Sequence, residues 1–150
     1  MHSLTSTLVA CALVASFAVG CGGDGDGYCD TVVETQTEFA DFSRGDFSTL
    51  SSFRDRLHEL ADTGPTEVQD DWELLASKFD SFLSALDEIG LEPTQLEDPE
   101  SIELPEGVDP DAFAVAMTQA KGLRGPAFDA AVERIADHAR TECNITFDNS

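Results

Sequence analysis

The sequence predicts an all-α protein, an up-down helical bundle of the four-helix type whose last wall is a broken pair of helices. Apolar residues recur at helical spacing through most of residues 28–143. Proline and glycine stand at the boundaries of the periodic segments, where helices start and stop. Strand-like alternation of useful length and internal repeats are not found, and 150 residues suit one domain.

The first two helices are expected at residues 28–43 and 47–61. The apolar face of the first contains Tyr28, Val32, Phe39 and Phe42, and Gly45 ends it. Asp46 is the expected N-cap of the second helix, and Gly64-Pro65 stops it. The apolar stripe of this second helix is Phe47, Leu50, Phe53, Leu57 and Leu60.

The third helix, residues 65–89, has the most regular pattern. Its apolar residues alternate four- and three-residue steps: Val68, Trp72, Leu75, Phe79, Phe82, Leu86 and Ile89. Such a seam also occurs in coiled-coil dimers, which is the alternative here. Because the other helices offer matching stripes, we expect a wall of an intramolecular bundle and a monomeric protein.

Residues 91–109 form an acidic loop, with three prolines and no base. Asp109-Pro110-Asp111 then starts a helix by the usual N-cap and proline rules. Gly125-Pro126 breaks this helix, and a last helix runs to Cys143. The apolar positions of the two are Phe113, Ala116, Met117 and Ala120, followed by Phe128, Val132, Ile135 and Ala139. Residues 144–150 are expected to be a tail.

The N-terminus has the pattern of an export signal over residues 1–20. An uncharged apolar stretch, LVACALVASFAV, runs over residues 8–19 and is too short to span a bilayer. The small residues Ala18-Val19-Gly20 directly precede Cys21. This arrangement resembles a bacterial lipoprotein signal, which implies lipidation of Cys21 and attachment to the cell membrane. Ordinary secretory cleavage after Gly20, giving a secreted protein, is the alternative. Residues 21–27 then form a flexible tether.

The remaining cysteines are predicted to form one disulfide. Cys11 leaves with the signal peptide and Cys21 carries the lipid, so that Cys29 and Cys143 remain as a pair in an oxidising compartment. In an up-down bundle these residues lie at the same end, because one opens the first helix and the other closes the last. Free thiols and a metal-binding pair are the alternatives, although CxxC spacing is absent.

The formal net charge of −22 argues against nucleic acid and against anionic lipid headgroups as partners. With the disulfide end near the membrane, the acidic loop faces outward. We therefore expect a partner or cation surface there, comprising Glu92, Glu97, Asp98, Glu100, Glu103 and Glu106.

The sequence shows no pattern for catalysis, a cofactor or a metal. The stretch from Asp24 fails as an EF-hand because Cys29 takes the glycine position and Thr35 the final glutamate position. His58 and His138 lack the Glu-x-x-His spacing of di-iron bundles and are expected at the surface or its boundary. Trp72 and the phenylalanines are expected in the core, with an apolar ligand pocket as the alternative.

Residues 28–143 also resemble small exported helical proteins of actinobacteria. The likeness is carried by Tyr28-Cys29-Asp30, by the segment from Gly64 to Trp72, and by Cys143 at the end of the last helix. The resemblance implies the fold and an extracytoplasmic location, and it says nothing about function. Because the core is well patterned and no catalytic set of residues converges, we expect a bundle domain at 28–147 that acts as a non-enzymatic binding or scaffolding lipoprotein. A binder of small ligands or cations is the alternative.

Overall fold

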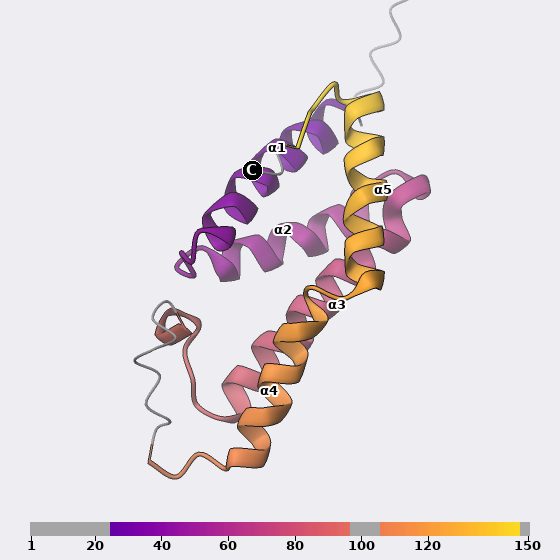
Figure 1. Cartoon of the computed structure of the whole chain (residues 1–150). Helices are drawn as coiled ribbons and strands as arrows, with labels where there is room; N and C mark the ends of the chain where they lie inside the picture. Colours follow the sequence, from indigo (N-terminus) through magenta and orange to yellow (C-terminus); the bar gives the residue numbers. More distant parts are fainter. Residues whose placement is uncertain (1–24, 97–105, 148–150) are drawn as a thin grey trace, which may run out of the picture.

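A computed structural model describes residues 25–96 and 106–147 and shows an all-α bundle (Figure 1). Four walls pack side by side, and the last wall is a broken pair of helices, so the predicted fold class is confirmed. The elements are α1 (Gly25–Ser43), α2 (Leu50–Thr63), α3 (Thr66–Glu88), the 3₁₀ turn η1 (Pro93–Leu96), α4 (Pro110–Gly122) and α5 (Pro126–Glu142). The predicted leader and Cys21 lie outside the described residues.

The longest helix, α3, supports both pieces of the broken wall. Figure 1 shows α5 and α2 beside one half of α3 and α4 beside the other half. The break between α4 and α5 falls at Gly125-Pro126, as predicted, since proline starts a helix but cannot continue one. At 1.5 Å per residue, α3 measures about 35 Å.

The core is built around Phe79 of α3, whose side chain is fully buried. Its ring centroid lies 4.9 Å from that of Phe53 in α2 and 5.6 Å from that of Phe42 in α1. Phe128 of α5 approaches to 6.3 Å on the remaining side. Trp72 is also buried. The aromatic side chains therefore pack on one another as core, which was the main expectation for them.

Two helix ends use glycine as the sequence predicts. Gly90, at φ +67°, follows α3, and the amide of Leu91 donates to the carbonyl of Leu86. Gly45, at φ +88°, ends α1 in the same way, with the amide of Asp46 bonded to the carbonyl of Asp41. Both are Schellman ends, in which glycine takes the left-handed conformation that other residues avoid.

Two helix starts differ from prediction. Residues 25–27, which the sequence analysis assigned to the tether, already belong to α1. The start of α2 is Leu50 rather than Phe47, and Asp46 is not its N-cap. The Asp46 carboxylate instead accepts bonds from the amide and hydroxyl of Ser48 at 3.0 and 2.6 Å, which close a separate turn before the helix. These two bonds lower the pKa of Asp46.

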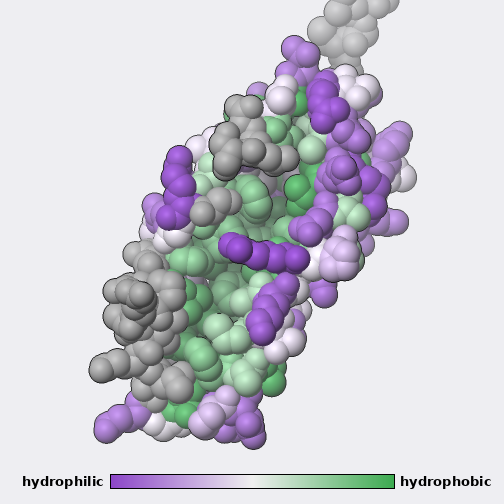
Figure 2. All heavy atoms as spheres, viewed as in Figure 1, coloured by the Kyte–Doolittle hydropathy of each residue, from purple (hydrophilic) through white to green (hydrophobic). Residues whose placement is uncertain are grey.

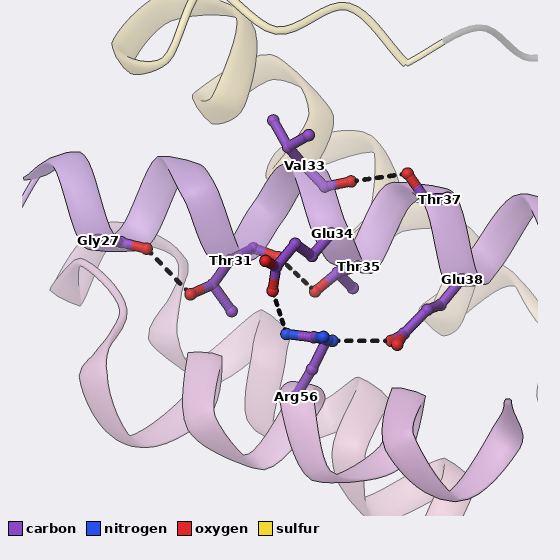
Figure 3. A network of polar contacts seen from close by, with 8 residues as sticks. All are labelled: Gly27, Thr31, Val33, Glu34, Thr35, Thr37, Glu38 and Arg56. Carbon is purple, nitrogen blue, oxygen red and sulfur yellow. Dashed lines mark hydrogen bonds and ion pairs between the residues drawn. The ribbon is translucent and has the colours of Figure 1, made fainter.

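Polar contacts join the walls outside the core. Arg56 of α2 forms ion pairs with Glu34 and Glu38 of α1, the latter at 3.1 Å from Nε to Oε2 (Figure 3). On another side, the guanidinium of Arg134 in α5 donates to both carboxylate oxygens of the buried Asp71 in α3. A bidentate pair of this kind fixes the rotation of α5 about its axis as well as its distance from α3.

The disulfide between Cys29 and Cys143 closes the bundle, as predicted. It joins Cys29, the fifth residue of α1, to the residue that caps α5, across a sequence separation of 114. Beneath it, the indole of Trp72 donates to the hydroxyl of Tyr28 at 3.4 Å. Burial raises the pKa of Tyr28, and the bond from Trp72 offsets part of that rise. We call this end of the molecule the disulfide end.

Loss of the disulfide is expected to lower the free energy of unfolding by about 4–5 kcal/mol, since the crosslink restricts a long loop in the unfolded chain. Urea unfolding of the oxidised and dithiothreitol-treated protein, followed by the fluorescence of Trp72, measures this difference. The Cys29→Ser/Cys143→Ser variant should match the reduced protein. Equal unfolding midpoints for the oxidised and reduced forms would contradict the prediction.

Gly64 is expected to tolerate no side chain. A Cβ atom at this position would lie 2.3 Å from the carbonyl oxygen of Leu60 and 3.3 Å from the Trp72 ring. Gly64→Ala should therefore destabilise the protein by about 1–3 kcal/mol in thermal unfolding. Gly122→Ala is the matched control, because a Cβ there meets nothing within 4 Å, and its effect should stay within about 1 kcal/mol. Equal effects of the two substitutions would refute this account.

Candidate functional site

A pocket of about 370 Å³ lies at the end of the bundle opposite the disulfide. One wall is the end of α3, where Glu88 and Ile89 precede the turn at Gly90. The facing wall is the segment 106–109 and the first turn of α4. We call this cavity the distal pocket; its lining is Glu88, Ile89, Gly90, Glu106, Gly107, Val108, Asp109 and Ala112.

Local sequence positions each wall of the distal pocket. Gly107, at φ +95°, turns the chain between Glu106 and Val108. Asp109 then caps α4, because its carboxylate accepts a bond from the amide of Asp111 at 3.1 Å. The predicted Asp-Pro-Asp helix start therefore holds one edge of the pocket in place.

The distal pocket is open to solvent and is lined by apolar and acidic residues in similar measure. Ile89 is buried and Val108 half-buried, while the rim residues Glu88, Glu106 and Asp109 are exposed to solvent. Apolar surface beneath carboxylates suits an organic cation, whose alkyl part packs while its charged head meets the acids. An amine or guanidinium group has this character.

The described residues suit a bare metal ion less well than an organic cation. Among residues 25–96 and 106–147, no group of three or more His, Cys, Asp or Glu side chains is placed to hold a metal. Calcium needs six to eight oxygen ligands around one point.

The structure brings part of the predicted acidic surface into the distal pocket. Glu106 lines it, whereas Glu92 is exposed and its amide bonds to the side chain of Gln95 at 2.7 Å, next to η1. The other four predicted residues lie outside the described residues: Glu97, Asp98, Glu100 and Glu103. Sequence reasoning missed Glu88 and the rim position of Asp109, although both flank the acidic loop.

The histidines lie away from the distal pocket. Nε2 of His58 lies 2.8 Å from Asp80 Oδ2 on the surface between α2 and α3. His138 is half-buried at the disulfide end, where Nδ1 lies 3.4 Å from the hydroxyl of Tyr28. Each histidine thus has a structural partner, at the surface or its boundary as expected.

The comparisons with known proteins do not assign the chain to a family. No protein-family model matches the chain, and neither curated proteins nor solved structures include a match. Within the part of the chain that the structure describes, no helix has the length and apolar character needed to cross a bilayer.

Proposed function

We propose that this protein is a non-enzymatic binding or scaffolding module of the cell envelope. The observation that carries the proposal is the placement of two features at opposite ends of one rigid helix. The ends of the fold are joined by the disulfide near the start of α3, and the distal pocket lies where α3 ends. One end is thus suited to attachment and the other to recognition.

Attachment is proposed through a lipid on Cys21, at the outer face of the cytoplasmic membrane. Cys21 precedes the start of α1 by four residues, which reach at most about 14 Å when extended. The disulfide end would then stay close to the bilayer, and α3 would carry the distal pocket about 35 Å outward. The disulfide supports an extracytoplasmic location, since such bonds persist in oxidising compartments.

Recognition is proposed at the distal pocket, with a lysine or arginine side chain of a partner protein as the group bound. Three carboxylates on the rim would pair with its charge, and Ile89, Val108 and Ala112 would contact its alkyl stem. The charge of −22 would speed the approach of a basic partner, in a way that added salt reduces.

A small organic cation is the second candidate for the same site. The volume of about 370 Å³ lies at the low end of the usual range for small-molecule pockets, and because the pocket is open to solvent it would enclose only the cationic part of such a ligand. Both candidates place an amine or guanidinium group in the distal pocket. In the first this group belongs to a partner protein, and in the second to a small molecule.

The anchor is tested by the intact mass of the protein extracted from membranes of its own host. We expect cleavage before Cys21, added acyl chains, and the loss of two hydrogens at Cys29 and Cys143. Cys21→Ser should release the protein from the membrane fraction. An unacylated mature chain in the culture medium would instead establish the secreted alternative.

The distal site is tested by photo-crosslinking on intact cells. A photoreactive amino acid at Glu106 should form an adduct with a partner protein, whereas one at the exposed Glu142, at the disulfide end, should not. Adding Glu88→Lys should abolish the adduct, because it cancels the remaining charge of the rim without touching the Asp109 cap. Equal adducts from both positions, or adducts that survive Glu88→Lys, would count against the site.

A thermal-shift measurement separates the second candidate. Arginine methyl ester or spermidine should raise the Tm of the wild-type protein and leave that of Glu88→Lys unchanged if the pocket takes small cations. A rise with calcium alone would favour metal binding instead. No rise with any of these, together with the Glu106 adduct, assigns the pocket to a protein partner.

A further inference from the structure

We infer that residues 144–147 form a strap that reversibly closes an apolar seam between α1 and α5. The strap begins at Asn144, which takes the left-handed conformation at φ +55° directly after the disulfide cysteine. The amide of Ile145 then bonds back to the carbonyl of Ala139 at 3.2 Å. The chain therefore reverses instead of extending α5, and Figure 1 shows it running back beside α1.

The seam under the strap exists because α1 and α5 meet only at the disulfide end. From there the two helices diverge (Figure 1). The space-filling view shows that the face between them is largely apolar and that this surface continues toward α4 (Figure 2). The helices bordering this face carry half-buried apolar side chains, namely Phe39 and Phe42 in α1, Phe113 and Met117 in α4, and Val132 in α5.

The strap presents apolar side chains at alternate positions. Ile145 and Phe147 pack against the core, while Asn144 and Thr146 between and beside them are exposed. In an extended segment alternate side chains face the same way, so this pattern suits a strip of chain lying over an apolar face. The strap thus occupies the seam in the manner of a short extended peptide.

The strap is short, and its two apolar side chains are only half-buried. A hydrogen bond to α1 runs from Nε2 of the partly exposed Gln36 to the carbonyl of Thr146 at 3.1 Å. Intramolecular attachment adds to these contacts, because the bond from Cys143 to Cys29 fixes the start of the strap beside α1. Short tethers give effective concentrations in the millimolar range, at which weak contacts suffice for closure.

An element that is closed mainly by its tether can open without loss of the fold. The open form would expose the seam to an extended segment with apolar residues at alternate positions, which would take the place of the strap. The strap is therefore a built-in competitor for this surface. The inference is independent of the distal pocket and of the lipid anchor.

The test compares Ile145→Ser/Phe147→Ser with Val115→Ser, a matched loss of an apolar side chain that is 54% exposed on α4. With the disulfide and the helical circular dichroism unchanged, the strap variant should bind several times more anilinonaphthalene sulfonate. It should also exchange the α1 amides of residues 32–39 faster. Val115→Ser should behave as wild type, and a synthetic peptide of residues 144–150 at millimolar concentration should reverse the dye binding.

A second variant keeps the test decisive if the double substitution fails to fold. Gln36→Ala removes no apolar contact and should give intermediate dye binding with normal helix content. Wild-type dye binding and exchange in both variants would overturn the inference, as would a peptide without effect. Global unfolding of the double variant together with wild-type behaviour of Gln36→Ala would show that the strap is part of the core.

Discussion

The whole arrangement depends on the burial of one ring, that of Phe79, among rings contributed by three other helices. Phe42, Phe53 and Phe128 bring α1, α2 and α5 to the same point on α3. Packing of this kind must offset self-repulsion in a chain with a net charge of −22. It does so because each ring removes apolar area from water, and Phe42 and Phe53 also meet Phe79 edge to face. Most acidic side chains of the described residues lie at the surface, where Arg56 pairs with two of them, while the buried Asp71 pairs with Arg134.

Concentrating the core around Phe79 divides the bundle into two unequal halves. Toward the disulfide, α1, α2 and α5 all pack around α3, and the crosslink lies above them. Toward the distal pocket, α4 lies on α3 and contributes one fully buried residue, Ala116. The apolar positions Phe113 and Met117 remain only half-buried for this reason. Most of the stabilising packing therefore lies at the disulfide end, which is the proposed membrane side. The half-buried apolar side chains lie farther from it, where fewer packing contacts restrict a recognition surface.

Sequence alone predicted the parts of the molecule that depend on local chemistry. The third helix followed from its unbroken apolar seam and from Gly90, and the disulfide from a count of cysteines in a topology that brings them together. The start of α2 was missed because the carboxylate of Asp46 accepts bonds from the amide and hydroxyl of the nearby Ser48 instead of capping the helix. The distal pocket was only half predicted, since Glu88 and Asp109 are unremarkable acids until the fold brings them to one rim. Nor did a polar-looking tail reveal that Ile145 and Phe147 lie on the core.

The two proposed recognition surfaces rest on different physics, and the same disulfide links them. Pairing at the distal rim is electrostatic, so its strength depends on ionic strength and on the charge of Glu88. Closure of the seam is apolar and depends on how near Cys143 holds the strap to α1. Because the crosslink fixes both the ends of the fold and the start of the strap, opening it would release the seam before it affected the distal end of α3. An acidic bundle of this kind can therefore offer a charged surface and an apolar one that respond to separate conditions, although both are carried by a single core.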